Sequence, residues 1–423
     1  MIVPSIDLMD GRAVQLVGGE RLELDAGDPR PWMERFTRVG EVAVVDLDAA
    51  LGRGDNAAVI EELCALGPCR VGGGIRSYEA ARRWLDAGAA QLVLGTAAEP
   101  ELLRRLPRER LVAALDARDG EVVVDGWRRG TGRGVEERIR ELAPFVSGFL
   151  VTFVEREGRL GGTAIDRVPA LVRAAGTARV TIAGGITEPD EIRELDRLGA
   201  DAQVGMSLYT ERLGLAAALA APLRSDREDG LWPTIVEDER GQTLGLCYSS
   251  GESLHAALEE GRGVYQSRQR GLWRKGESSG ATQELLRVRA DCDRDTLCFT
   301  VRQAGPGFCH TGSASCFGGR RGLTALEDRL AARRAAAPRG SYTARLLGDP
   351  GLLRSKLAEE AEELAAAVSR EEVVWESADL LYFTLVAMAR AGVALEEVER
   401  ELDRRGLGLT RRPGDAKPLE VGR

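Results

Sequence analysis

Short apolar runs alternate with amphipathic segments along the first half of the chain. Each run is continuously hydrophobic, which is typical of a strand buried on both faces of a parallel sheet. Helical patterns fall between the runs, for example at residues 80–87 and 189–198, and this repeated alternation predicts a closed (β/α)8 TIM barrel. The eight predicted strands are residues 2–7, 42–48, 71–74, 92–95, 111–116, 149–154, 180–184 and 202–205.

The predicted barrel repeats itself after about 110 residues, because a Gly-Gly pair and a later strand-end glycine recur at matching places. Such glycines fit tight turns, and a single pair would favour that interpretation. The fourfold coincidence instead favours two phosphate sites at one barrel mouth, each built from backbone N–H groups. The predicted phosphate-binding residues are Gly73, Gly74, Gly95, Thr96, Gly184, Gly185, Gly205 and Met206.

One aspartate ends a predicted strand in each half of the repeat. Asp7 ends the first strand and Asp116 ends the fifth, at the strand ends where barrels carry their catalytic groups. The alternative interpretation is that both are ordinary loop acids exposed to solvent. Because only His255 and His310 are present, proton transfer in the barrel must rest on carboxylates, and this pair suits a general base and a general acid.

A polar segment at residues 223–230 ends the barrel pattern, and a mostly antiparallel α+β module is expected after it. We predict one helix at residues 251–260. The predicted strands are residues 233–236, 244–248, 263–265, 285–288 and 297–301.

Two kinds of metal ligand share one segment of this module. Asp291, Asp293 and Asp295 alternate with Cys292 on a predicted strand, so the carboxylates would share one face. Oxygen ligands favour Mg²⁺, whereas the thiols of Cys292, Cys309 and Cys316 favour Zn²⁺ with a fourth position open for water. The alternative is that these thiols are buried core residues. We interpret Cys298, which has apolar neighbours, as a core thiol. A hydrolytic centre is predicted.

The last part of the chain is predicted to be helical and acidic. Glu360 and Glu363 share one helix face, and Glu376 and Asp379 share a face of the next helix. Together these four carboxylates predict a Mg²⁺ site. The alternative is a solvated charged surface, which we favour for Glu362 and for residues 396–401.

Composition limits the class of protein. With 423 residues, 43% hydrophobic and 30% charged, the chain is long enough for several globular domains, predicted at residues 1–224, 225–320 and 321–423. A net charge of -9 offers no basic footprint for nucleic acid. No apolar run approaches membrane-spanning length, so no membrane partner is expected. Seven unevenly spaced cysteines indicate reduced thiols and a cytoplasmic location.

The first part resembles the ProFAR isomerases of histidine biosynthesis, through residues 4–8, 72–77 and 115–118. The resemblance implies an Amadori rearrangement of a ribosylamine aldose to its ketose. Asp7 would then take the proton from the sugar carbon, Asp116 would protonate the ring oxygen, and Thr152 would assist. The chain departs from the family at residues 157–159, which are Glu-Gly-Arg where the family usually has Asp-Gly-Thr.

The middle part resembles phosphoribosyl-AMP cyclohydrolase through residues 265–268, 272–277 and 279–280 together with the two metal motifs. That resemblance implies hydrolytic opening of the adenine ring with Zn²⁺ and Mg²⁺. It also implies a homodimer that binds zinc across its interface. Ala281 stands where many bacterial members have a histidine, although fungal fused versions also lack it.

The helical part, residues 323–405, resembles phosphoribosyl-ATP pyrophosphohydrolase, with residues 340–347 as a further mark. The tail at residues 410–418 is similar to that of fungal fused enzymes. Three such modules predict an enzyme that carries phosphoribosyl-ATP, a small-molecule nucleotide, through the second to fourth steps of histidine synthesis. Three alternatives stay open: a barrel that is only a scaffold, a barrel that also isomerises phosphoribosylanthranilate, and a sensing protein with decayed sites.

Overall fold

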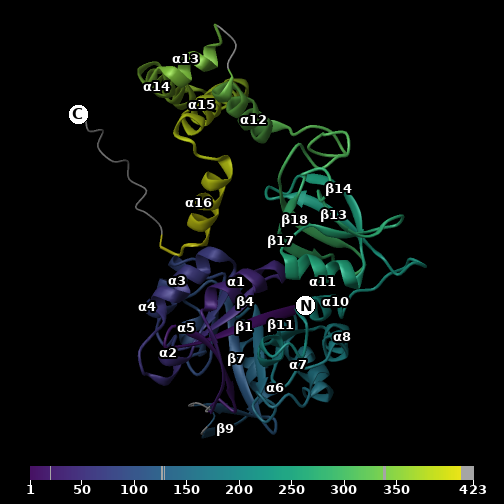
Figure 1. Cartoon of the computed structure of the whole chain (residues 1–423). Coiled ribbons are helices and arrows are strands. Elements are labelled where there is room, and N and C mark those ends of the chain that lie inside the picture. The colour runs from purple at the N-terminus through teal and green to yellow at the C-terminus, as the bar shows by residue number, and fades with distance from the viewer. Residues whose placement is uncertain (20, 125–126, 128, 337–339, 411–423) are drawn as a thin grey trace. The chain divides into compact units, whose positions relative to one another are not determined.

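The computed structural model describes residues 1–19, 21–124, 127, 129–336 and 340–410. The chain divides into two compact units (Figure 1). The first holds Met1–Gly241, Leu246–Gly305 and the described residues after 406, and the second holds Gln242–Gly245 and Pro306–Gly406. Except for Thr410, the predicted tail at residues 410–418 lies outside the described residues.

A closed parallel barrel forms the larger part of the first unit, which confirms the predicted fold. Its strands run in the order β10-β11-β12-β1-β4-β5-β6-β7, and pairing of β7 with β10 closes the ring. Figure 1 shows helices around the outside of these strands. The barrel strands are β1 (Ile2–Met9), β4 (Val42–Asp46), β5 (Cys69–Gly72), β6 (Gln91–Leu94), β7 (Leu111–Arg118), β10 (Gly148–Phe153), β11 (Arg179–Ala183) and β12 (Ala200–Val204).

Amphipathic helices connect the strands and bury their apolar faces on the ring. In α8, Ile192 and Leu195 are buried while the charged face stays outside. The helices are α1 (Pro29–Phe36), α2 (Leu47–Leu51), α3 (Ala57–Leu66), α4 (Tyr78–Asp86), α5 (Pro100–Leu103), α6 (Val135–Leu142), α7 (Val168–Ala175), α8 (Pro189–Arg197), α9 (Met206–Tyr209) and α10 (Leu215–Ala220), with short 3-10 turns η1 (Thr37–Val39), η2 (Arg108–Arg110) and η3 (Ile165–Arg167).

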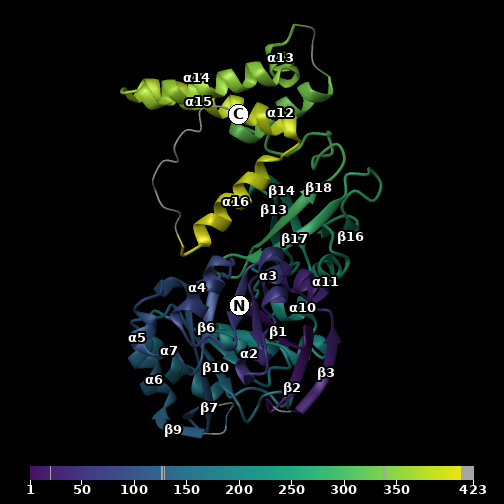
Figure 2. The same ribbon diagram turned by 90° about the vertical axis from the view of Figure 1, so that its left-hand side faces the viewer.

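The internal repeat extends to two hairpins that the apolar pattern does not reveal. After β1 the chain forms β2 (Arg12–Val17) and β3 (Arg21–Gly27), and after β7 it forms β8 (Glu121–Val124) and β9 (Arg129–Gly134). Each hairpin prolongs its barrel strand antiparallel (Figure 2). Inside the barrel, Val112, Leu150 and Ala183 pack as a buried cluster, so the strand ends stand on a rigid core.

After the barrel, the chain forms a small sheet of order β14-β13-β18-β17 and a β15–β16 hairpin. Helix α11 (Gly251–Glu260) lies between β14 and β15 in the chain, where the sequence predicts it. β17 pairs antiparallel with β18, whereas β13 pairs parallel with it. The strands are β13 (Trp232–Asp238), β14 (Thr243–Ser249), β15 (Val264–Ser267), β16 (Gly271–Arg274), β17 (Gln283–Ala290) and β18 (Leu297–Gln303).

One local prediction for this module was wrong. Residues 291–295 form a loop of bends between β17 and β18 rather than a strand, so strand alternation does not place their side chains. The segment must reverse the chain between two antiparallel strands, and five residues rich in Asp suit such a connection.

The second unit is mainly helical. Its core packs Leu346, Leu353, Phe383 and Val386 from α13, α14 and α15. Within the described chain, no single helix is long and apolar enough to cross a membrane, although α15 and α16 pass that test as a pair bent by 109°. The helices are α12 (Gly322–Ala335), α13 (Tyr342–Gly348), α14 (Pro350–Ala366), α15 (Arg370–Ala391) and α16 (Leu395–Leu407).

Two strand-end glycines of the first half-barrel should respond differently to a side chain. Gly73 has a φ of +93°, and a Cβ there would lie 2.2 Å from the backbone oxygen of Asp46, whereas a Cβ at Gly95 meets nothing within 4 Å. We expect Gly73→Ala to lower the free energy of unfolding by at least about 2 kcal/mol. Gly95→Ala is the matched control and should change it by less than about 0.5 kcal/mol. Urea unfolding of both variants measures this difference, and equal stabilities would contradict it.

Candidate active sites

The barrel mouth brings the two predicted acids onto strands of opposite halves. Asp7 lies on β1 and Asp116 on β7, and both side chains are partly accessible. In the β7–β10 pairing, Asp116 stands opposite Thr152, and the buried Thr152 hydroxyl hydrogen-bonds the Asp116 carboxylate. The structure therefore joins Asp116 with the threonine that the resemblance names as its assistant.

Burial sets the protonation of these acids. Loss of hydration raises the pKa of Asp7 to about 7. Burial also raises the pKa of Asp116, although hydrogen bonds from Trp127 and Thr152 oppose the rise. A carboxyl group with a pKa near 7, such as that of Asp7, is suited to general acid–base work, because both protonation states are available at neutral pH.

A third carboxylate stands close to both, and the sequence prediction did not assign it a role. Glu157, in the loop after β10, has a pKa raised to about 7 by burial first and then by the charges of Asp7 and Asp116. Its Oε2 lies 3.2 Å from where a Cβ on Gly184 would stand. The available signal was its position, since Glu157 replaces the aspartate of the usual Asp-Gly-Thr.

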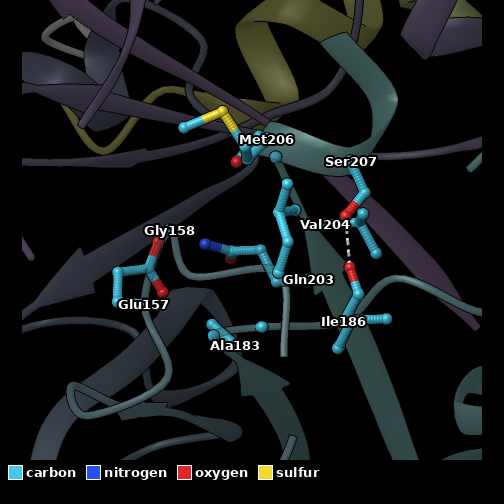
Figure 3. A pocket seen from close by; sticks show the side chains of 13 residues that line it. Glu157, Gly158, Ala183, Ile186, Gln203, Val204, Met206 and Ser207 are labelled. Atoms are coloured by element: carbon cyan, nitrogen blue, oxygen red, sulfur yellow. Dashed lines mark hydrogen bonds between the residues drawn. The ribbon is translucent and has the colours of Figure 1, made fainter. Parts of the chain in front are cut away.

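The predicted phosphate-binding residues of the second half-barrel line one pocket with Glu157 (Figure 3). Gly184 and Gly185 follow β11 with φ values of +99° and +79°, and a Cβ on Gly185 would collide with the backbone oxygen of Gly162 at 2.5 Å. Gly205 and Met206 line the same pocket. Figure 3 shows the Glu157 and Gln203 side chains extending into it.

The first half-barrel has the matching arrangement. Gly73 and Gly74 follow β5 with φ values of +93° and +70°, and Gly95 and Thr96 follow the adjoining strand β6. Pairing of β5 with β6 therefore brings both parts of this set to one side of the mouth.

A buried polar network supports the mouth on the side of Asp7. Asn56 donates from its side chain to Asp46 at 2.7 Å and to Asp48 at 2.9 Å. The backbone N–H of Asp10 donates to Asp48 at 2.8 Å, and that of Gly11 donates to Asn56 at 2.7 Å. This network ties the turn after β1 to the segment after β4, and so restricts the backbone next to Asp7.

The three loop carboxylates come together although they do not lie on a strand. Asp291, Asp293 and Asp295 place oxygens within 4.8 Å of one another. The Oδ1 of Asp291 accepts the backbone N–H groups of Asp295 and Thr296, each at 3.1 Å. Burial acts to raise the pKa of Asp291, but these hydrogen bonds outweigh it and lower the pKa. Three converging carboxylates are the donor set of a hard divalent cation.

Two of the three predicted zinc ligands lie together in the second unit. Cys309 and Cys316 interact through their side chains, and the Thr311 hydroxyl donates to Cys309 Sγ at 3.2 Å. The contact with Thr311, followed by that with Cys316, lowers the pKa of Cys309. A thiol with a lowered pKa is a better ligand for a soft cation, because metals bind the thiolate. Cys292 is exposed and belongs to the first unit.

The helical domain brings its predicted acids together between α14 and α15. Glu360, Glu376 and Asp379 place oxygens within 4.8 Å of one another. Burial first, and then the charges of Glu363, Glu360 and Asp379, raise the pKa of Glu376. All four predicted carboxylates therefore interact, and their oxygens suit Mg²⁺.

Two neighbours of this acidic site were not predicted. Glu359 joins Glu360 and Glu363 in a second cluster. The ammonium of Lys356 lies 2.8 Å from both Glu359 and Glu360, and this pairing raises the pKa of Lys356. Lys356 thus balances part of the negative charge of this carboxylate cluster, and a divalent cation would balance the rest.

Comparisons with known proteins agree with this sequence of sites. Residues 1–214 match the family model described as histidine biosynthesis protein. Residues 245–318 match phosphoribosyl-AMP cyclohydrolase, and residues 323–406 match phosphoribosyl-ATP pyrophosphohydrolase.

Each of three curated relatives matches about half of the chain. A trifunctional histidine biosynthesis protein of Komagataella pastoris is 49% identical over 238 residues, which cover 56% of this chain and 28% of that protein. A bifunctional histidine biosynthesis protein of Schizosaccharomyces pombe is 52% identical over 207 residues, which cover 49% of this chain and 50% of that protein. The chain thus spans half or less of either relative. An imidazole-4-carboxamide isomerase of Thermus thermophilus is 40% identical over 231 residues, 51% of this chain and 97% of that enzyme.

The barrel match covers just over half of the chain, and the two smaller matches follow it in the order of the proposed sites. The chain therefore belongs to the histidine biosynthesis protein family and carries cyclohydrolase and pyrophosphohydrolase domains after its barrel.

Proposed function

We propose that the chain catalyses three consecutive reactions: pyrophosphate release from phosphoribosyl-ATP, opening of the adenine ring of phosphoribosyl-AMP, and isomerisation of ProFAR to PRFAR. The observation that carries the proposal is the barrel mouth. Three carboxylates with raised pKa stand there beside a glycine-lined pocket. A scaffold would have no need to bury like charges together, because their burial and repulsion cost stability.

In the isomerisation, Asp7 acts as the base that removes the proton from the sugar carbon. Asp116 protonates the ring oxygen as the ring opens, and its hydrogen bond with Thr152 fixes the orientation of the carboxyl group. The two glycine sets bind the phosphates at the two ends of the substrate through backbone N–H groups. That arrangement holds the reacting carbon between the two acids.

The hydrolytic steps rest on the metal sites. Mg²⁺ held by Glu360, Glu363, Glu376 and Asp379 would position a water and offset phosphate charge during pyrophosphate release. Zn²⁺ on Cys292, Cys309 and Cys316 would activate the water for ring opening, with Mg²⁺ on Asp291, Asp293 and Asp295. Support comes from the convergence of each carboxylate set and from the Cys309–Cys316 contact.

We further propose a homodimer through the cyclohydrolase domain, with zinc bound across its interface, in the cytoplasm. All seven cysteines are free, which supports a reducing location. The proposed partners are small phosphoribosyl nucleotides, with no nucleic acid and no membrane.

The backbone around Ala281 is enclosed, which bears on the histidine it replaces. Ala281 is buried, and a Cβ at Gly276 would lie 2.2 Å from its carbonyl carbon. Gly276 therefore packs directly against the Ala281 backbone, and we propose that ring opening proceeds without an imidazole at position 281.

A single assay tests the whole proposal. Purified protein receives phosphoribosyl-ATP with Mg²⁺ and Zn²⁺, and chromatography follows each intermediate. We expect PRFAR as the product. Accumulation of phosphoribosyl-AMP would show that the middle site is inactive, and accumulation of ProFAR would show that the barrel is only a scaffold. Phosphoribosylanthranilate, supplied separately, tests the breadth of the isomerase.

The pH dependence of isomerisation should follow the carboxylates at the mouth. Asp7 must be ionised to act as base, so kcat/KM should rise with pH until about 7, the pKa of Asp7. It should fall again where Asp116 loses its proton. Charge repulsion is mutual, so Glu157→Gln should lower the pKa of Asp7 and move the rising limb to lower pH. Stopped assays with ProFAR across pH 5 to 9 check this, and an unmoved limb would contradict it.

Replacing the proposed base Asp7 should abolish isomerisation without disturbing the rest of the protein. We expect Asp7→Asn to lower isomerase kcat by at least about 100-fold, while pyrophosphate release by the same protein stays at the parent rate. Parallel assays on ProFAR and phosphoribosyl-ATP measure both. Full isomerase activity in this variant would refute the role of Asp7.

The helical metal site offers a matched pair of substitutions on α14. Glu360→Gln removes a buried carboxylate of the cluster, and Glu362→Gln removes an exposed one outside it. The first should raise the Mg²⁺ concentration needed for half-maximal pyrophosphate release by at least about tenfold. The second should leave it unchanged. Equal shifts in both variants would contradict the site.

A further inference from the structure

The loop proposed to bind Mg²⁺ in the cyclohydrolase domain holds one cation, Arg294, between Asp293 and Asp295. Its backbone takes a left-handed conformation with a φ of +67°, which is unfavourable for a residue with a Cβ. Two hydrogen bonds hold it there. The backbone N–H of Arg224 donates to the Arg294 carbonyl at 2.7 Å, and Arg294 Nη1 donates to the carbonyl of Asp291 at 3.1 Å.

The other side of the guanidinium reaches the barrel. Arg294 Nε and Nη2 both donate to Oδ1 of Asp196, at 3.3 and 3.1 Å. Asp196 lies in the last turn of α8 and is also paired with the N-terminal ammonium at 3.3 Å. The Arg294 and Asp196 side chains are only 19% and 16% exposed, so solvent screens this ion pair less than a surface pair.

We propose that Asp196 of the barrel and Arg294 form an anchor that positions the Mg²⁺ loop of the cyclohydrolase. The inference rests on the proposed function in one respect, that Asp291, Asp293 and Asp295 bind the cation. Neither Asp196 nor Arg294 contacts the metal. Arg294 acts through the Asp291 carbonyl and the loop backbone, and the barrel carboxylate holds Arg294.

The loop needs such support for an electrostatic reason. Three carboxylates within 4.8 Å repel one another before a cation binds, and residues 291–295 belong to no helix or strand that would resist their separation. A guanidinium fixed at both ends holds the backbone in the converged arrangement. The loop is then already ordered before the cation binds. Because binding no longer has to offset the entropy lost in ordering the loop, the cation binds more tightly.

Mn²⁺ binding to the full chain, followed by electron paramagnetic resonance, tests the anchor without relying on catalysis. The parent for all measurements carries Glu376→Gln and Asp379→Asn, so that the helical site does not contribute. In this parent, we expect Arg294→Met and Asp196→Asn each to weaken Mn²⁺ binding by about tenfold, and Arg294→Lys to restore part of it.

Asp201→Asn is the matched control. Asp201 also pairs with the N-terminal ammonium, at 2.7 Å, but lies on β12, so its removal should leave Mn²⁺ binding unchanged. Isomerase activity on ProFAR, for which the proposed groups are Asp7 and Asp116, should remain at the parent level in Asp196→Asn and would indicate an intact barrel.

The outcomes separate the anchor from the site itself. If Asp291→Asn with Asp293→Asn binds Mn²⁺ as the parent does, the proposed metal site is refuted. If that variant loses binding while Asp196→Asn binds like the parent, the site stands and the anchor is refuted. An equal loss in Asp201→Asn would attribute the effect to general disturbance of the barrel and would also refute the anchor.

Discussion

Three of the proposed sites gather carboxylates closer together than their charges favour. Asp7, Asp116 and Glu157 interact at the barrel mouth, and three carboxylates converge both in the loop after β17 and between α14 and α15. Like charges at such separations repel by about 1 kcal/mol or more per pair, depending on the local dielectric. Each cluster therefore exists only because the surrounding fold holds its members in place.

The clusters relieve this repulsion in different ways, and the difference matches their chemistry. Inside the barrel the acids are partly buried, so protonation is the available relief, and the pKa of Asp7 and Glu157 rises to about 7. Between the helices, Lys356 lies 2.8 Å from Glu360 and balances part of the charge. A site relieved by protons suits proton transfer, and a site that still lacks positive charge suits a divalent cation.

The parts predictable from sequence were those governed by local pattern. Continuous apolar runs predicted the barrel strands, and a strand-end position predicted Asp7 and Asp116. The hairpins after β1 and β7 were missed because the exposed β3 carries polar residues, and Glu157 received no role because its neighbours at the mouth come from β1 and β7. The loop at residues 291–295 was misjudged as a strand, since alternation of Asp and other residues does not distinguish a strand from a turn rich in Asp.

Contacts between distant segments were beyond such patterns. Asp196 and Arg294 are 98 residues apart, and each alone has the sequence signal of an ordinary surface charge. Because of this pairing, the hypothesis of a catalytic barrel and the hypothesis of a barrel that supports the hydrolase domains no longer exclude each other. The strand ends of the barrel carry the acids proposed for the isomerase, while the outer helix α8 carries the carboxylate proposed to position the hydrolase loop. The two groups lie on different elements of the barrel, on β1 and β7 in one case and on α8 in the other, so both roles fit one barrel.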